Sequence, residues 1–514
     1  MRSLPLRLVG AALAGLLAAL SFEPYGWVYL LPLAVAGLTT ALLRLSPGRG
    51  FLVGLAFGLA FMLLLLPWLT VIGSDAWVLL SLLEALFYGV GGAATALVTR
   101  LHWWPIWAAS AWVGVETLRG TVPFGGFPWG RLAFATIDTP VAAAMAYVGA
   151  AGTTFLVALV GATLAWAGER VREAPVPAVG AVAAACTLSV LAAGWPLHQP
   201  DPQGDYPRTS VAAVQGDVPG EGMNPFSERR AVLDNHVAAT IELAARVRAG
   251  SEPRPDLVVW PENSTDIDPF SDASVYADIQ SAVDAIGVPV LVGAMVGGEE
   301  PSDVYNQGIV WEPGTGPAQT YSKRHPVPFG EYIPLRDQLA PYISRLDQIP
   351  RDMVAGDRPG VLEMNGVRIG DVICFEVAYD DVVRDAANST AMLVVQTNNA
   401  TYMGTGQVGQ QFAISRLRAI ETGLPVVVAA TNGITGIVAP DGEVTAQAEV
   451  RSRAVLSASL IGPVGESWGL RLGFAVQVML VGISAIATAG GLLLGYRRRS
   501  RTDQTVSASK TGVA

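Results

Sequence analysis

The sequence predicts a multi-pass α-helical membrane domain of about eight spans that carries an extracytoplasmic α/β domain. The 514 residues are 51% hydrophobic and 15% charged, with a mean hydropathy of +0.41, which is too apolar for a wholly soluble protein. Long apolar runs fill the first 195 residues and recur near the C-terminal end. Between them, from about residue 207, short β-branched runs alternate with helical stretches, which is typical of an α/β domain.

Eight apolar runs have the composition of membrane spans. Most of them reach the ~20 residues that are needed to cross a bilayer, although the fifth is short and rich in tryptophan. The first run resembles a signal peptide, but a second apolar run follows at once, so we interpret the first as an uncleaved span. The runs are residues 6–20, 27–43, 50–69, 76–98, 103–118, 141–167, 176–195 and 473–495.

Arginines between the apolar runs indicate the orientation, because loops on the cytoplasmic side carry an excess of Lys and Arg. With the N-terminus inside, the outer connections carry Arg119 and Arg131, whereas the cytoplasmic connections and the C-terminal end carry Arg44, Arg49, Arg100, Arg170, Arg172, Arg497, Arg498, Arg499 and Arg501. Both termini are therefore expected in the cytoplasm. The predicted organisation is seven spans in 1–195, an extracytoplasmic domain in 196–470, a last span in 471–496 and a basic and polar tail in 497–514.

The segment 196–470 is long enough for one α/β domain with a sizeable core. The turn at Asp441-Gly442 predicts a hairpin. In α/β folds, active groups cluster in loops at the carboxyl ends of strands. We expect strands at 209–215, 257–261, 288–294, 304–311, 367–375, 391–396 and 425–431, and helices at 228–248, 274–286 and 409–422.

Cys374 is the residue on which a catalytic hypothesis depends. The second cysteine, Cys186, lies in an apolar run, so the chain has no disulfide framework. Cys374 ends a strand-like run, and such a cysteine is either a packed core residue or a nucleophile. Because free cysteine is among the most buried residue types, this segment taken alone favours the core.

Two further residues change that balance. Lys323 follows a strand-like stretch and is the one lysine outside the polar tail, while Glu262 follows the strand predicted at 257–261. Each alone could be an ordinary loop charge. Together with Cys374 they supply the groups for covalent acyl transfer: a thiolate nucleophile, a carboxylate that takes its proton and a cation that stabilises the oxyanion.

Other chemistries find less support in the sequence. His325 lies close to Lys323, so a Cys–His pair remains open, but no companion Asn or Asp pattern supports it. No His/Cys cluster has the spacing of a metal site, and no phosphate-binding or dinucleotide motif occurs, so neither a metal nor a cofactor is expected. The net charge of −10 argues against nucleic acid as a partner.

The membrane part has its own unusual features. The connection at 119–140 is rich in Gly, Pro and aromatic residues, and we interpret Trp129 there as an interfacial anchor rather than a catalytic residue. Glu23, Glu84 and Glu116 lie near or within spans. Such carboxylates indicate either a functional site or an interhelical hydrogen bond.

Several motifs resemble one family. WPE at 260–262, YSKRHPVPFGEYIP at 321–334 and GDVICFE at 370–376 are similar to the Glu-Lys-Cys set of the nitrilase, or carbon–nitrogen hydrolase, superfamily. Further segments resemble its membrane-embedded branch, the apolipoprotein N-acyltransferases, nearly throughout the chain. These segments are VAAVQGDVP at 211–219, QTNNATYMG at 396–404, QQFAISRLRAIETGLPVV at 410–427, TNGITGIVAPDGE at 431–443, LSFEPYGW at 20–27 and GGFPWGRL at 125–132.

The resemblance implies an αββα sandwich on the outer face of the bacterial plasma membrane and a two-step reaction. Cys374 would take an acyl chain from a phospholipid and pass it to the amino-terminal diacylglyceryl-cysteine of a lipoprotein. By motif, Glu262 would be the base and Lys323 the cation on the side of the oxyanion. Glu331 would orient Lys323, and Glu376 would be a third acidic residue beside the nucleophile.

The resemblance also has departures, which bear on how lipid is bound. Phe375 stands where some family members have Tyr, and Thr401 where many have Trp. Phe226 stands roughly where others place a Trp in a mobile loop. Lipid or substrate contacts are expected at Trp129, Phe226 and Tyr402. Loops 219–228, 340–358 and 401–408 are either lids or plain surface loops.

Two alternatives to an acyltransferase stay open. A membrane-tethered amidase or nitrilase would share the triad, but eight spans are not needed by an enzyme whose substrate is small and soluble. A degenerate member of the family could bind lipoproteins without catalysis, although the intact set of Glu262, Lys323 and Cys374 argues against this.

Overall fold

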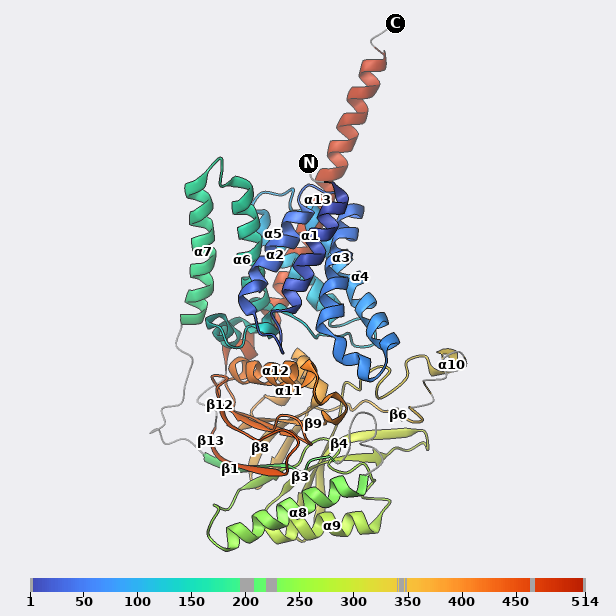
Figure 1. Cartoon of the computed structure of the whole chain (residues 1–514), viewed down its shortest axis with the longest axis vertical. Helices are drawn as coiled ribbons and strands as arrows, with labels where there is room; N and C mark the ends of the chain where they lie inside the picture. Colours follow the sequence, from blue (N-terminus) through green and yellow to red (C-terminus); the bar gives the residue numbers. More distant parts are fainter. Residues whose placement is uncertain are drawn as a thin grey trace. The chain divides into compact units, whose positions relative to one another are not determined.

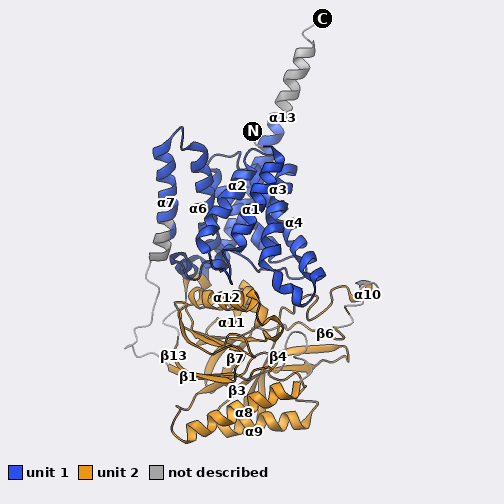
Figure 2. Ribbon diagram, in the orientation of Figure 1, with its two compact units in different colours: residues 1–195, 471–514 blue, residues 196–470 orange. Residues whose placement is uncertain are grey.

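The computed structural model describes residues 3–194, 208–218, 229–339, 341, 346, 349–462 and 467–511. Contacts divide the chain into two compact units, which Figure 2 colours separately. The helical unit consists of residues 1–195 and 471–514, and the α/β unit of residues 196–470.

Each of the eight apolar runs lies on a helix of the helical unit. These helices are α1 (Leu4–Ala19), α2 (Leu31–Leu42), α3 (Pro47–Leu65), α4 (Ser74–Val98), α5 (Trp104–Arg119), α6 (Met145–Arg170), α7 (Pro175–Gly194) and α13 (Trp468–Thr511) (Figure 1). Among the described residues, four helical stretches are long and apolar enough to cross a membrane: Pro47–Leu65, Ser74–Val98, Pro140–Arg170 and Trp468–Arg497. Three apolar helical stretches are shorter: Leu4–Ala19, which is α1, Val28–Leu42, which contains α2, and Pro175–Thr187, which is the first part of α7. Helix α5 has 16 residues.

Two buried carboxylates tie the helical unit together. Glu84 on α4 accepts a hydrogen bond from Arg119 on α5 at 3.2 Å, and both side chains are buried. Glu116 on α5 accepts from the backbone N–H of Leu132 at 2.8 Å and from Thr154 on α6 at 2.8 Å. The sequence left two alternatives open for these glutamates, a functional site or an interhelical hydrogen bond. The observed contacts of both are interhelical hydrogen bonds.

The α/β unit contains two sheets. The first has the strand order β13-β1-β2-β3-β4-β5, with β6 paired to β4, and the second has the order β12-β11-β10-β9-β8-β7. The strands β1, β2 and β3 run parallel, as do β8, β9 and β10. The first sheet is built from β1 (Arg208–Gln215), β2 (Leu257–Val259), β3 (Val290–Gly297), β4 (Asp303–Glu312), β5 (Gly316–Ser322), β6 (Asp352–Met353) and β13 (Ala454–Ile461), and the second from β7 (Val361–Met364), β8 (Val367–Ile373), β9 (Met392–Thr397), β10 (Val426–Ala430), β11 (Gly436–Val438) and β12 (Val444–Gln447).

Strand alternation places the two sheets face to face. On β1, Val211 and Ala213 join a core cluster that also contains residues of β8, β9 and β10, so this face lies between the sheets. The alternate residues Ala212 and Val214 pack instead with residues of α8 (Arg229–Arg248) and α9 (Ala273–Ile286). Figure 1 shows α8 and α9 outside the first sheet, and α11 (Asp380–Ala386) and α12 (Gly406–Thr422) outside the second. The unit is therefore an αββα sandwich, as the family resemblance implied.

The predicted elements differ from the observed ones mainly at their ends. The strand predicted at 367–375 ends at Ile373, and Cys374 begins a short 3-10 helix with a φ of +56°. The strand predicted at 257–261 ends at Val259, just before Trp260 and Pro261. The elements that were not predicted are β6, β7, β13, α11 and the one-turn helix α10 (Arg336–Leu339). β5 corresponds to the strand-like stretch before Lys323, and β11 and β12 form the hairpin predicted at Asp441-Gly442.

Candidate active site

Glu262 is a buried carboxylate whose two oxygens both accept hydrogen bonds. It follows β2, where the chain passes so close to β3 that a Cβ added to Gly293 would lie 2.7 Å from the Glu262 Cα, so a side chain at 293 would displace it. Glu262 Oε1 accepts from Asn306 Nδ2 at 2.7 Å and from Lys323 Nζ at 3.1 Å. Oε2 accepts from the backbone N–H of Asn398 at 2.8 Å. These donors fix the position of the carboxylate.

Lys323 lies between two carboxylates. Its side chain is 1% exposed, and Nζ donates to Glu331 Oε1 at 2.6 Å as well as to Glu262. The second oxygen of Glu331 accepts from the backbone N–H of Val327 at 2.8 Å. A buried ammonium is stable when it is paired and hydrogen-bonded in this way.

The charges around Lys323 keep it protonated. Burial alone would lower the pKa of Lys323, but the carboxylates of Glu262 and Glu331 outweigh burial and raise this pKa well above its ordinary value. Burial and the charge of Glu262 raise the pKa of Glu331, while Lys323 opposes them. The ammonium is therefore a fixed positive charge over the whole physiological range of pH.

Cys374 lies directly after β8 in a partly buried position. Its φ of +56° is uncommon for a residue other than glycine, and strained backbone of this kind gathers at functional sites. Thr397 Oγ1 lies 3.4 Å from Cys374 Sγ, and Gln411 Nε2 lies 3.8 Å from it. Cys374 therefore has polar neighbours in addition to the packing against the core that its own segment favoured.

The thiol of Cys374 needs a base. Burial raises its pKa to about 12; the negative charge of Glu262 contributes, whereas Lys323 and the Thr397 hydroxyl oppose. At that pKa only about one thiol in 10⁵ is ionised at pH 7. The thiolate is the nucleophilic form, so a group that removes the proton during the reaction is required. Glu262 is the carboxylate with the largest electrostatic effect on this thiol.

Glu376 joins the segment of Lys323 to the segment of Cys374. Its Oε1 accepts from the backbone N–H groups of Arg324 (2.6 Å) and His325 (3.1 Å), and its Oε2 accepts from the backbone N–H of Ile373 (2.9 Å). The Tyr321 hydroxyl lies 3.0 and 2.9 Å from the two oxygens. The fully buried carboxylate thereby holds the end of β5 against the end of β8, and the bond to Ile373 explains why β8 stops there.

Replacement of Glu376 by glutamine is expected to loosen this connection. One acceptor oxygen would become an NH₂ group that faces backbone donors, and each buried donor left without a partner costs about 1–3 kcal/mol. We expect a fall in the thermal midpoint of about 5 °C and a slower acylation of Cys374. Thermal unfolding of the purified protein measures the first effect. Glu363→Gln, at an exposed glutamate on β7, is the matched control and should leave the midpoint unchanged; equal midpoints for both variants would contradict the assigned role.

The other predicted site residues lie at different distances from this centre. Phe375 is 8% exposed, and its ring lies 5.6 Å from that of Tyr379. Burial raises the pKa of the Tyr402 hydroxyl, and the charge of Cys374 raises it further. Tyr402 therefore lies close enough to the site to interact electrostatically with Cys374. His325 stacks on Tyr379 at 4.2 Å and lies 3.4 Å from Asp381, so its ring contacts do not indicate a pair with Cys374.

The structure does not test the other two predicted lipid contacts, Trp129 and Phe226. Trp129 belongs to the helical unit and is 1% exposed; its ring lies 5.8 Å from that of Trp68, and its carbonyl accepts from Arg119 at 2.6 Å. It is a buried residue rather than an exposed anchor. Phe226, with the whole loop 219–228 and part of the loop 340–358, lies outside the described residues. Lipid contacts at these positions stay predictions.

The sequence did not reveal the amide and hydroxyl groups of the site. Asn306 donates to Glu262 from its side-chain amide and Asn398 from its backbone N–H, while Thr397 and Gln411 lie next to the thiol. All of them lie in segments that were recognised as strands or motifs, yet Asn, Gln and Thr carry no charge that singles them out. For Thr397 and Asn398, the position at the end of β9 is a signal that could have found them, whereas Asn306 lies within β4 and Gln411 within α12, and the sequence gives no such signal for these two.

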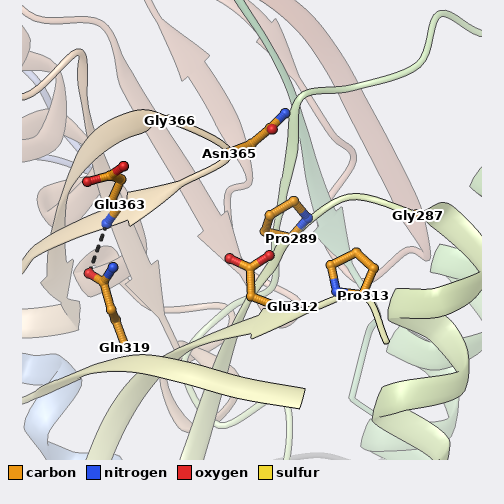
Figure 3. A pocket seen from close by; sticks show the side chains of 8 residues that line it. All are labelled: Gly287, Pro289, Glu312, Pro313, Gln319, Glu363, Asn365 and Gly366. Atoms are coloured by element: carbon orange, nitrogen blue, oxygen red, sulfur yellow. Dashed lines mark hydrogen bonds between the residues drawn. The ribbon is translucent and has the colours of Figure 1, made fainter. Parts of the chain in front are cut away.

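A separate pocket lies away from these residues. Figure 3 shows its lining residues, among which the backbone N–H of Glu363 donates to Gln319 Oε1 at 3.1 Å. None of Glu262, Lys323 and Cys374 lines it. The lining consists of Gly287, Pro289, Glu312, Pro313, Gln319, Glu363, Asn365 and Gly366. In the part of the chain that the structure describes, no group of three or more His, Cys, Asp or Glu side chains is placed to hold a metal ion.

Comparisons with known proteins agree with the fold. Residues 210–466 match the carbon-nitrogen hydrolase family, so the α/β unit is a carbon–nitrogen hydrolase domain. Residues 14–163 match the apolipoprotein N-acyltransferase N-terminal domain. Given both matches and the relatives below, the chain belongs to the apolipoprotein N-acyltransferase family, which confirms the resemblance seen in the sequence.

Relatives from several bacteria share nearly the whole chain. The apolipoprotein N-acyltransferase of Mycolicibacterium smegmatis is 38% identical over 96% of this chain and 86% of its own length. That of Ralstonia nicotianae is 30% identical over 93% of this chain and 94% of its own. Among solved structures, an amidase from Nesterenkonia sp. is 17% identical with a TM-score of 0.37, over 51% of this chain and 94% of its own. At that level the likeness adds nothing to the family assignment.

Proposed function

We propose that this protein is an apolipoprotein N-acyltransferase. It transfers an acyl chain from a phospholipid, through a thioester on Cys374, to the amino group of the diacylglyceryl-cysteine at the N-terminus of a lipoprotein. The observation that carries the proposal is the buried Lys323 held between Glu262 and Glu331 in the electrostatic environment of the Cys374 thiol. The relatives that match nearly the whole chain support the choice of acyl transfer over other reactions of this fold.

In the first step, Glu262 takes the thiol proton while the sulfur attacks the ester carbonyl of the phospholipid. The carbonyl oxygen becomes an oxyanion, which the ammonium of Lys323 stabilises. The bond to the glycerol oxygen then breaks, and Glu262 returns its proton to that oxygen. The products are lysophospholipid and the acyl thioester of Cys374.

In the second step, the amino group of the lipoprotein attacks the thioester carbonyl. Glu262 accepts a proton from the attacking amine, and the carbon–sulfur bond breaks to leave an amide. The proton held by Glu262 then returns to the sulfur, and the enzyme is restored. Glu331 positions Lys323, and Glu376 positions the segments that carry Lys323 and Cys374. These steps use side chains of the protein itself. Phe375 supports the site beside the nucleophile, and Tyr402, Trp129 and Phe226 are assigned to lipid contact.

The membrane arrangement belongs to the same proposal. Eight spans in a bacterial plasma membrane place both termini in the cytoplasm and residues 196–470 outside it. Both substrates then lie in the same bilayer as the enzyme. An acyl chain that stays in an apolar medium on its way to Cys374 avoids a cost of about 0.8 kcal/mol for each CH₂ exposed to water.

Labelling of single cysteines tests this topology. In a protein that lacks Cys186 and Cys374, Asp357→Cys on the α/β unit should react with a membrane-impermeant maleimide in intact spheroplasts, because its side chain is 91% exposed. Glu173→Cys, in the connection after α6, should react only after the membrane is permeabilised. Labelling of Glu173→Cys in intact spheroplasts would contradict the proposed orientation.

One assay separates the proposed activity from its alternatives. Purified enzyme is incubated with a phospholipid that carries a labelled acyl chain and with a diacylated lipopeptide. We expect a labelled triacylated lipopeptide and lysophospholipid. Free labelled fatty acid that does not depend on the lipopeptide would indicate a hydrolase, and ammonia released from a small amide would indicate an amidase. Binding of the lipopeptide without any transfer would indicate a binding protein.

A further inference from the structure

A buried carboxyl group that the reaction above does not use lies next to the site. Asp371 lies on β8 between Ile369 and Ile373, whose side chains belong to the core between the two sheets. Because side chains alternate along a strand, Asp371 faces the same core. Its side chain is fully buried, and neither carboxyl oxygen has a hydrogen-bond partner among the described residues. Such a group requires an explanation, because buried polar atoms are nearly always paired.

The surroundings of Asp371 supply a partner if the carboxyl carries a proton. A Cβ added to Gly308 on β4 would lie 2.1 Å from Asp371 Oδ2 and 2.7 Å from Gln396 Oε1, so both oxygens face the same small space. Gln396 Oε1 also lacks a hydrogen-bond partner within the described part of the chain. Two oxygens without hydrogen cannot bond to each other, whereas a carboxyl hydroxyl can donate to an amide oxygen.

The orientation of the Gln396 amide is fixed by its other contact. Its Nε2 donates to the Trp260 carbonyl at 2.6 Å. Turning the amide over would place two acceptor oxygens at that distance, so Oε1 has to face Asp371. Trp260 precedes Glu262 by two residues, and Asp371 precedes Cys374 by three.

We propose that Asp371 is a positioning residue that acts in its neutral form. Its hydroxyl donates to Gln396 Oε1, and Gln396 donates in turn to the Trp260 carbonyl. This connection joins the strand that ends at Cys374 to the strand end that carries Glu262, across the two sheets. The proposal rests on the proposed function, because it assigns Asp371 to the geometry between the base and the nucleophile.

The charges that face Asp371 favour the neutral form. Glu376, after the same strand, and Glu262, after β2, both present negative charge to it, while Tyr321 on β5 is held neutral by burial. β9 presents Gln396 and β4 presents Gly308, neither of which titrates. Burial raises the pKa of Asp371 well above its ordinary value, and both glutamates raise it further. The adjacent Val372 N–H opposes this shift but does not reach hydrogen-bonding geometry.

A carboxyl whose pKa is raised in the folded state makes stability depend on pH. Its contribution is fully present below the unfolded pKa of about 4 and is lost as pH rises toward the folded pKa. Asp371→Asn keeps the shape and the donor to Gln396 but cannot ionise. The thermal midpoint of Asp371→Asn should therefore exceed that of the wild type by a margin that grows between pH 5 and pH 8. Asp357→Asn, at an exposed side chain, is the matched control and should show no such margin.

Acylation kinetics test the positioning role on the full-length enzyme. Asp371→Asn should form the acyl-enzyme from phospholipid within about threefold of the wild-type rate. Asp371→Leu has a similar volume but no donor, and its maximal acylation rate should fall at least tenfold with little change in the phospholipid concentration that gives half of that rate.

The outcomes decide the proposal separately from the proposed function. Equal acylation by Asp371→Leu and the wild type would overturn it, and so would parallel pH curves of the midpoint for Asp371→Asn and the wild type. If Asp371→Leu does not fold, the comparison of Asp371→Asn with the wild type still decides. A wild-type enzyme that takes no acyl chain from phospholipid would refute the proposed function, while the pH curves would still test the neutral state of Asp371.

Discussion

Replacement of Cys374 by serine is expected to abolish formation of the acyl-enzyme and lower acyl transfer by at least about a thousandfold. Loss of a nucleophile removes the covalent step, and such losses reach about 10⁶-fold in other enzymes that use a side-chain nucleophile. A serine hydroxyl is a much weaker acid than a thiol, so the same base cannot ionise it to a useful extent. Transfer of a labelled acyl chain to a diacylated lipopeptide measures the effect.

Cys186→Ser is the matched control for this variant. It makes the same chemical change at an exposed cysteine of α7 and should leave both acylation and transfer at the wild-type level. Thermal unfolding of the two variants checks that each is folded. Transfer by Cys374→Ser at a tenth of the wild-type rate or more would contradict a thioester mechanism.

Replacement of Glu262 by glutamine should give the second large effect, a fall of at least about a hundredfold in the rate of acylation. Glutamine keeps the size of the side chain but cannot take the thiol proton, and general bases contribute about 10²–10⁴-fold. The remaining rate should rise about tenfold for each unit of pH, because solvent then has to ionise the thiol. The wild-type rate should be nearly constant from pH 7 to pH 9, since Glu262 removes the proton in place.

The same variant should make the thiol more acidic while it makes the enzyme slower. The charge of Glu262 contributes to the raised pKa of Cys374, so its removal lowers that pKa from about 12, whereas Lys323 remains. The ultraviolet absorbance of the thiolate, measured in a Cys186→Ser background, reports ionisation without a reaction, and it should appear at a lower pH in the variant than in the wild type. A thiolate absorbance that appears at the same or a higher pH would contradict the contribution of Glu262 to the pKa of Cys374.

The outline of the α/β unit could be predicted because its central strands are mostly apolar runs rich in β-branched residues. β9 and β10 are buried at every residue, and this burial produces the apolar signal that the sequence shows. β7 has four residues and β13 is largely half-exposed, so neither produces a comparable run. The strand predicted at 367–375 included Cys374 and Phe375, which are also hydrophobic. The backbone leaves the sheet after Ile373 because Glu376 binds the N–H of Ile373.

The charged members of the site could be named from the sequence because they are chemically conspicuous. Lys323 is the one lysine outside the tail, and Cys374 is the one cysteine outside the apolar runs. Their mutual arrangement, with Glu331 as the second partner of Lys323, is a property of the folded chain. The roles of Asn306 and Asp371 could not be predicted, because their significance comes from the groups that strands distant in sequence bring beside them.

The mass of the intact enzyme tests the central claim most directly. After incubation with a phospholipid of defined acyl chains, the protein should gain the mass of one acyl chain, and fragmentation should place it on Cys374. A diacylated lipopeptide with a free amino group should remove the added mass and gain the acyl chain itself. The same lipopeptide with an acetylated amino group should leave the acyl-enzyme intact. An added mass at another residue, or its loss to water at an equal rate with both lipopeptides, would contradict the account.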